Sequence, residues 1–231
     1  MPDEQTLLAF LIFLPILLFS FTLHEYGHAV VAMWGGDMTA AQDNRVNMNP
    51  INHIDPIGSL LIPALMFFGS GGMMLGWARP VPIQDNNFAD RRWLLAAVIA
   101  GPFMNFLIAL FGGLFLGLFH LVFLAGTTYG FWDYQEELLT AVNGFLFQII
   151  FLNLLLIVFN FIPIPPLDGS HIFYHLFIRG KSQYYEAWDF FARFGIIFLL
   201  LAINILPLEV VVLPMTQVMM TVTNPLLVFS P

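Results

Sequence analysis

Long apolar stretches constrain the fold of this chain more than any other feature of its sequence. At least four stretches reach the length of about 20 residues that crosses the hydrocarbon core of a bilayer. Hydrophobic residues make up 59% of the chain and charged residues 10%, against roughly 45–50% and about 25% in soluble domains. A water-soluble fold of this size could not bury so much apolar surface. The sequence therefore predicts an integral membrane protein that crosses the bilayer several times.

The apolar stretches predict where the membrane segments lie. We expect helices at about 7–34, 93–124, 138–162 and 185–206, followed by an apolar tail at 208–230 that Pro214 and Pro225 interrupt. The segment at 57–77 carries Pro63 and a glycine-rich run, which weaken a straight helix. Residues 77–83 hold two prolines and should be extended, because each proline disfavours helical geometry in its predecessor.

These segments predict one architecture. It is an all-α polytopic membrane protein with about five to six membrane segments, one of them irregular or re-entrant, and a short extended stretch. Residues 1–231 would form a single integral-membrane domain, with a catalytic core at about 8–180 and C-terminal membrane segments at about 185–231. The N-terminus lacks the basic region of a cleavable signal, so the first apolar stretch should remain as a mature helix.

The charged residues and the lack of cysteine exclude several kinds of partner and site. A formal net charge of −8 without any basic block argues against nucleic acid. The chain has no cysteine, so histidines and carboxylates would have to hold any metal ion. The apolar segments make the lipid bilayer a partner, and the sequence leaves the oligomeric state open.

One short cluster places metal-binding chemistry inside the first apolar segment. His24-Glu25-Tyr26-Gly27-His28 is an H-E-x-x-H pattern. On a helix the two histidines project from one face and can hold one zinc ion, with Glu25 beside them as a base. Ionisable side chains at membrane depth are costly unless they are paired or used. The cluster thus predicts a metal-dependent hydrolase that works within the membrane.

Two histidines leave a catalytic zinc site incomplete, because such a site usually takes three protein ligands and a water. The best candidate for the third ligand is Asp168, which follows helix-breaking prolines at 163–166. Asp168 could instead form a turn before Gly169. With zinc in place, Glu25 would take a proton from water and pass it to the leaving amine, which is peptide hydrolysis without a covalent intermediate.

The basic residues predict the orientation. They lie in connections that we expect on the cytoplasmic side, namely Arg45, Arg79, Arg91, Arg92, Arg179 and Lys181. The N-terminal tail and residues 125–137 carry acids and no base, which places the N-terminus outside. If 57–77 crossed the membrane fully, Asp168 would emerge opposite the two histidines. We therefore expect this segment to re-enter or lie obliquely, sheltered by protein.

With these residues in view, the sequence resembles the site-2 protease family of intramembrane zinc metalloproteases. The resemblance rests on the H-E-Y-G-H cluster, on Leu167-Asp168-Gly169, on the G-P-x-x-N element at 101–105 and on Asn160. Residues 44–88 also resemble compact prokaryotic members, so most of the chain, roughly 8–180, is covered. No PDZ domain is inserted between the central helices, and gating by such a module is not implied.

The resemblance implies a role for each matching residue. The implied zinc ligands are His24, His28 and Asp168. Glu25 would be the catalytic base, and Asn160 and Asn105 would position the substrate or stabilise the oxyanion. The substrates would be transmembrane segments of other proteins, cut in regulated intramembrane proteolysis. The enzyme would be a multi-pass protein of the prokaryotic cell membrane with its active site toward the cytoplasm.

Several of these residues have structural alternatives. Asn105 could equally bond across packed helices, and Asn160 could bond a carbonyl freed near the prolines. His53 could bond within its polar loop or approach the metal, and His171 could share the helical face of Asp168. His120 and His175 are expected to serve in packing.

A different function would fit the same cluster, namely a non-catalytic membrane metal-binding protein or a transporter. Retention of Glu25 favours an enzyme, and the chain lacks the duplicated halves common in transporters. The stretch at 77–83 could let an unwinding substrate add to the enzyme as a strand.

Overall fold

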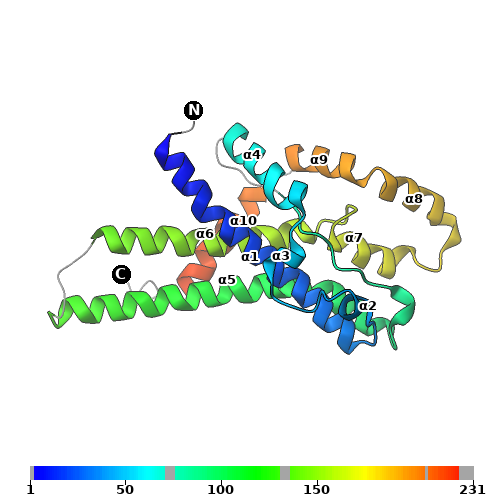
Figure 1. Ribbon diagram of the computed structural model, residues 1–231, viewed down its shortest axis with the longest axis horizontal. Helices are drawn as coiled ribbons and strands as arrows, with labels where there is room; N and C mark the ends of the chain where they lie inside the picture. The colour runs from blue at the N-terminus through cyan, green and yellow to red at the C-terminus, as the bar shows by residue number, and fades with distance from the viewer. Residues whose placement is uncertain (1–2, 71–75, 131–135, 206–207, 224–231) are drawn as a thin grey trace. The chain divides into compact units, whose positions relative to one another are not determined.

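A computed structural model of the protein describes residues 3–70, 76–130, 136–205 and 208–223 (Figure 1). Every regular element in these ranges is helical and none is a strand, which confirms the all-α prediction. The chain groups into two compact units, Met1–Met104 and Asn105–Pro231. The long helix α5 (Arg91–Thr128) begins in the first unit and ends in the second. The prediction of a single domain stays a prediction.

Helix α1 (Glu4–Trp34) forms the backbone of the first unit. It begins where the Asp3 carboxylate accepts a hydrogen bond from the Thr6 N–H (2.7 Å), the usual N-cap arrangement. It ends where the Gly35 N–H donates to the Val31 carbonyl (3.0 Å). Its 31 residues extend for about 46 Å, enough to cross a hydrocarbon core of about 30 Å. The predicted first membrane helix is confirmed, starting three residues earlier than expected.

The segment at 57–77 is irregular at its start, before Pro63; Pro63 and Gly69 lie within a regular helix, and the rest of the glycine-rich run falls outside the described residues. A π-helical turn, η1 (Pro56–Leu61), leads into helix α4 (Ile62–Ser70). The Asp55 carboxylate caps this turn by accepting the N–H groups of Ile57 and Gly58. The apolar helical run Pro56–Gly69 extends for only about 21 Å, short of a hydrocarbon core. Its re-entry into the membrane stays a prediction.

A buried aspartate fastens the loop after α1 to the chain that precedes α5. Asp37 is fully buried, and its carboxylate accepts hydrogen bonds from Thr39, Gln84 and Asn87. Burial by itself would raise the pKa of Asp37, but these hydrogen bonds outweigh it and leave the pKa below its usual value. The short helices α2 (Thr39–Gln42) and α3 (Pro50–His53) pack against α1 in the same unit.

The second unit is built around the C-terminal part of α5, α6 (Glu136–Asn160) and α10 (Leu208–Thr223). Helices α5 and α6 run alongside each other in Figure 1, and α10 packs against α6. Their shared core contains Ala109, Ile150, Leu154 and Val212. His120 Nε2 and the Asn143 side-chain oxygen are 2.7 Å apart, linking α5 to α6. His120 therefore serves in helix packing, as expected.

The predicted membrane helix at 185–206 is wrong. The chain forms two helices there, α8 (Tyr185–Arg193) and α9 (Gly195–Ile205), which separate at Phe194. Helix α8 carries Glu186, Asp189 and Arg193, and a spanning helix would have to bury these charges in lipid. The 11 residues of α9 reach only about 17 Å.

The remaining elements of the second unit are short. They are helix α7 (Asp168–Phe173), a π-helical turn (Tyr174–Ile178) and a 3-10 turn (Ser182–Tyr184). Across the parts of the chain that the structure describes, three helices are long and apolar enough to cross a membrane: α1, α5 and α6. Two shorter apolar helices, Pro56–Gly69 and α10, accompany them. The expected total of five to six membrane segments stays a prediction.

Candidate active site

The two histidines of the H-E-x-x-H cluster face each other on α1. Their Nε2 atoms lie 3.0 Å apart, and both side chains are buried. Two nitrogens that bind one tetrahedral zinc ion at 2.0–2.1 Å stand about 3.3 Å from each other. His24 and His28 therefore already hold close to the spacing that a shared zinc ion needs.

A backbone carbonyl of α5 fixes the orientation and tautomer of His28. His28 Nδ1 lies 2.7 Å from the carbonyl oxygen of Ala97. Because a carbonyl can only accept, Nδ1 carries the proton and Nε2 keeps its lone pair for a metal ion. Bonds of this kind orient metal-ligating histidines in many proteins. The sequence pattern did not indicate this partner, because Ala97 contributes only its backbone.

Gly101 leaves the space in which the two imidazoles meet. A Cβ atom at this position would lie 2.2 Å from His28 Nε2 and 2.7 Å from His24 Nε2, so no larger residue fits without moving a histidine. The two helices are close here, since a Cβ on Gly27 would lie 2.7 Å from the Ala100 carbonyl oxygen. The G-P-x-x-N element contains Gly101, but its role beside the histidines became visible only in the structure. The converging nitrogens and this cradle fit a zinc ion.

Glu25 is held by the segment that precedes α5. Its Oε2 accepts a hydrogen bond from the backbone N–H of Val81 (2.7 Å), and both residues are buried. The carboxylate therefore has a fixed position one residue from His24. Val81 is a functional neighbour that sequence reasoning missed, because the two residues are 56 positions apart.

Residues 76–84 form neither helix nor strand, and the first unit anchors them on both sides of Val81. On one side, the Arg79 N–H donates to the His53 carbonyl (2.9 Å) and the Arg45 guanidinium donates to the Arg79 carbonyl (2.6 Å). On the other side, the Gln84 N–H donates to Asp37 (2.7 Å). The segment that positions Glu25 is thus itself fixed by loop residues.

His53 supports this loop through both ring nitrogens. Its Nε2 lies 2.9 Å from the Asn47 carbonyl, so Nε2 carries the proton, and Nδ1 accepts from Arg45 Nη2 at 3.4 Å. The side chain is 1% exposed. Burial, followed by the nearby charge of Arg45, lowers the pKa of His53 below its usual value. The structure therefore shows the loop hydrogen bond, one of the two alternatives for this residue.

The second unit places Asp168 at the first position of α7, partly buried. The chain turns sharply there, since a Cβ on Gly169 would lie 2.5 Å from the Phe161 carbonyl oxygen. His171 is exposed on the same short helix, and His175 is buried, with its Nδ1 lying 3.2 Å from Arg179 Nη1. The role of Asp168 as a zinc ligand stays a prediction.

The two asparagines of the predicted site also lie in the second unit. Asn105 is fully buried in α5. Asn160 is the last residue of α6, and its side-chain amide donates to the Leu156 carbonyl (3.0 Å). Leu156 lies one turn earlier inside α6, so this is not the predicted bond to a carbonyl freed by Pro163. That alternative and the catalytic roles of both residues stay predictions.

Comparison with known proteins agrees with the geometry of the histidine pair. A sequence model of peptidase family M50 matches residues 12–202. YwhC of Bacillus subtilis, named as a zinc metalloprotease, is 38% identical over 198 residues, which cover 81% of this chain and 78% of YwhC. Rip2 of Mycolicibacterium smegmatis, with a name of the same kind, is 30% identical over 152 residues, covering 66% of this chain and 52% of Rip2. No solved structure was found to match the chain.

Proposed function

Since the chain belongs to peptidase family M50 and is an integral-membrane zinc metalloprotease, we propose that it hydrolyses peptide bonds within transmembrane segments of other proteins. The observation that carries the proposal is the position of His24, Glu25 and His28 inside α1, a helix long and apolar enough to cross a membrane. Glu25 lies about 14 Å before the end of that helix. Membership of a peptidase family favours an enzyme over a non-catalytic metal protein.

The proposed zinc ligands are His24, His28 and Asp168. Two histidines and one aspartate are a set of side chains that could bind one metal ion together. Zinc supplies Lewis-acid activation of water and of the scissile carbonyl. The paired Nε2 atoms and the space left by Gly101 support the histidine half of this set. Asp168, as the first residue of a short helix after the proline-rich turn, supplies the carboxylate of the set.

Glu25 is the proposed general base, taking a proton from water and passing it to the leaving amine. The Val81 N–H holds one carboxylate oxygen, which orients the group. Asn105 and Asn160 are proposed to contact the substrate or its oxyanion, and for Asn160 this requires exchange of its bond to Leu156.

The substrate is proposed to unwind and lie along residues 77–83. The N–H groups of Trp77, Arg79 and Val81 all bond within the first unit, and the prolines between and after them have none. An added strand would therefore donate its own N–H groups to carbonyls of this segment. A charged residue at Ile83 should impair cleavage and leave zinc content unchanged.

The proposed location is the prokaryotic cell membrane, with the active site toward the cytoplasm. Arg45, Arg79 and Arg179 lie outside the three helices that are long enough to span, which supports this orientation under the positive-inside rule. The proposed partners are transmembrane protein substrates and the lipid bilayer.

The test is cleavage of transmembrane peptides by purified protein in phosphatidylcholine vesicles. Wild type should cut at least one peptide of a panel, and Glu25→Gln should lose cleavage while it keeps its zinc. His24→Ala should lose both. Equal cleavage by wild type and Glu25→Gln would refute the proposed base, and cleavage confined to soluble loops would refute the intramembrane substrate.

A further inference from the structure

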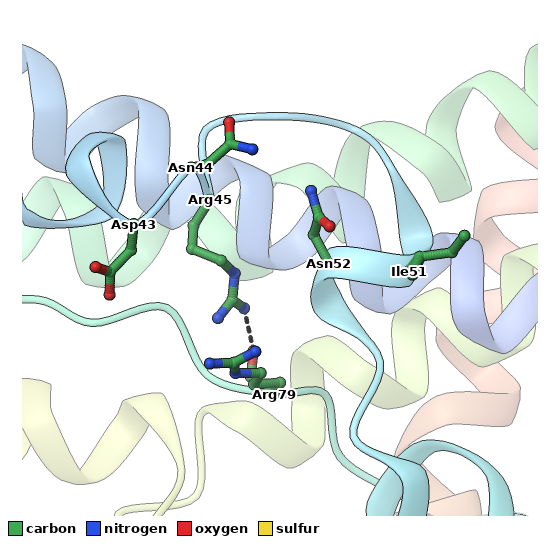
Figure 2. A pocket seen from close by; sticks show the side chains of 6 residues that line it. All are labelled: Asp43, Asn44, Arg45, Ile51, Asn52 and Arg79. Carbon is green, nitrogen blue, oxygen red and sulfur yellow. Dashed lines mark hydrogen bonds between the residues drawn. The ribbon is translucent and has the colours of Figure 1, made fainter.

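A polar pocket of about 350 Å³ opens beside the segment that holds Glu25 (Figure 2). It is formed entirely within the first unit, by the loop before α3, by α3 and by the extended segment. The residues that line it are Asp43, Asn44, Arg45, Ile51, Asn52 and Arg79. Figure 2 shows the guanidinium of Arg45 pointing toward Arg79, whose backbone carbonyl accepts its hydrogen bond, and both arginines line the pocket.

Arg45 is a buried cation whose hydrogen bonds go to backbone carbonyls and a histidine, although the charges of Glu25 and Asp43 act on it from nearby. Its side chain is 5% exposed, its guanidinium bonds backbone carbonyls and His53, and its Nε has no hydrogen-bond partner. Within the described residues, neither Arg45 nor Arg79 forms an ion pair with a carboxylate. Burial lowers the pKa of Arg45 below its usual value. The charge of Glu25 opposes this shift in pKa, the charge of Arg79 adds to it, and the charge of Asp43 opposes it again. Two like charges at one pocket wall create a site that attracts an anion.

The donors at this wall suit a carboxylate. An arginine guanidinium presents planar paired N–H groups that match the two oxygens of a carboxylate. The side-chain amides of Asn44 and Asn52 add further possible donors on the pocket lining. Asp43, also on the lining, opposes an anion there, and so does the charge of Glu25, which acts on Arg45.

The pocket lies beside residues 79–81, the part of the extended segment that holds Glu25. Arg45 bonds the carbonyls of Arg79 and Pro80, and Val81, two residues after Arg79, holds Glu25. Two residues of extended chain cover about 7 Å. A peptide that lies along this segment with its scissile bond at Glu25 would therefore bring a residue two to four positions away over the pocket.

We propose that the pocket lined by Arg45 and Arg79 is a substrate subsite that selects an aspartate or glutamate side chain two to four residues from the cleaved bond. This specificity rests on the proposed function, since it needs a peptide lying beside residues 79–83. It sets a sequence preference on the substrate, which a site defined only by zinc and Glu25 would lack.

Pairs of transmembrane peptides that differ only by Glu or Gln at one flanking position test the proposal. At one position, two to four residues from the cut, kcat/KM in phosphatidylcholine vesicles should be about tenfold higher for the Glu peptide than for the Gln peptide. This factor corresponds to the lower end of what a hydrogen bond to a charged group contributes. Asp43→Asn should raise this ratio, because it removes an opposing carboxylate. Arg79→Glu should reverse the preference toward a Lys peptide.

The Arg79 side chain is the better target for substitution, because only its backbone anchors the segment. Arg91→Glu is the matched control, an exposed arginine of the same unit that does not line the pocket. A Glu/Gln ratio near one at every position would overturn the proposal. Equal shifts of the Glu/Gln ratio by Arg79→Glu and Arg91→Glu would also overturn it, because a general charge effect would explain them. Loss of the Glu preference in vesicles that contain anionic phosphatidylglycerol would overturn it as well, because lipid phosphate would then be the occupant. Failure of wild type to cut any peptide would count against the proposed function instead.

Discussion

Replacement of Gly101 by alanine tests the metal centre without altering any metal ligand. The new Cβ would lie 2.2 Å from His28 Nε2 and 2.7 Å from His24 Nε2. These distances are about 1.2 Å and about 0.7 Å short of the 3.4 Å at which ordinary contact begins. One or both imidazoles must therefore move from their present positions.

Little in the surroundings can relieve this clash. The helices could relieve it only by moving apart where Gly27 packs closely against the Ala100 carbonyl, which would loosen that packing. His28 can swing away only by breaking its bond to Ala97. Loss of an orienting hydrogen bond alone costs about 10- to 100-fold in metal affinity. Displacement of the ligand itself adds to this, so we expect Gly101→Ala to bind zinc at least 100-fold more weakly, about 2.7 kcal/mol.

The assay is the zinc content of the purified protein, followed by a dissociation constant from competition with a chelating dye. Gly144→Ala is the control, since a Cβ at this position of α6 meets nothing within 4 Å. Alanine favours a helix over glycine by about 1 kcal/mol, so both variants should keep their helical circular dichroism. Full zinc occupancy in Gly101→Ala, with an affinity within about threefold of wild type, would refute the reasoning.

Three further substitutions test other contacts. Burial lowers the pKa of His53 from 6.5, and the charge of Arg45, which a protonated ring would face, lowers it further. The unfolded chain therefore binds the proton first as pH falls. Wild type should therefore lose thermal stability as pH falls through 6.5 and below. His53→Gln should lose less stability over the same pH range. Melting curves recorded at several pH values test both expectations. Asp168→Asn should lower zinc content with the helices intact, and unchanged zinc would place the third ligand elsewhere. Val81→Pro removes the N–H that binds Glu25 and should reduce kcat about tenfold or more with zinc retained, whereas Val81→Ala, which keeps the N–H, should not match that loss.

The long helices and the histidine pair were predictable from sequence because they depend on local properties. An uninterrupted apolar run of membrane length specifies a helix such as α1 whatever surrounds it. Helical geometry then places His24 and His28 on one face. The irregularity of the segment at 57–77 was expected at Pro63 and the glycines after it, but the structure places it earlier, in the π-helical turn Pro56–Leu61, and keeps Pro63 and Gly69 within α4.

The segment at 185–206 shows where this approach fails. Its average composition is apolar, which led to the prediction of one spanning helix. The structure separates a charged amphipathic helix, α8, from a short apolar one, α9, with Phe194 between them. The spacing of Glu186, Asp189 and Arg193 indicated an amphipathic helix, because residues three and seven positions apart share one helix face.

The contacts that complete the site were not predictable, because they join distant residues through the backbone. The partner of His28 is a carbonyl 69 residues away, and the partner of Glu25 is an N–H 56 residues away. Any residue type could supply these groups, so no side-chain pattern marks them. Gly101 was visible as a match to a family element, but its role depends on how closely α5 approaches α1.

One segment joins substrate recognition to the chemistry in this enzyme. Arg45 bonds the carbonyls of Arg79 and Pro80, and the next residue, Val81, orients Glu25. A change at the Arg45 side chain would therefore move the segment whose Val81 N–H holds Glu25, the proposed base on α1. The Arg79 side chain lines the pocket while its backbone alone makes the anchoring bonds. It follows that Arg45 acts on both kcat and KM, whereas the Arg79 side chain acts on the choice of substrate.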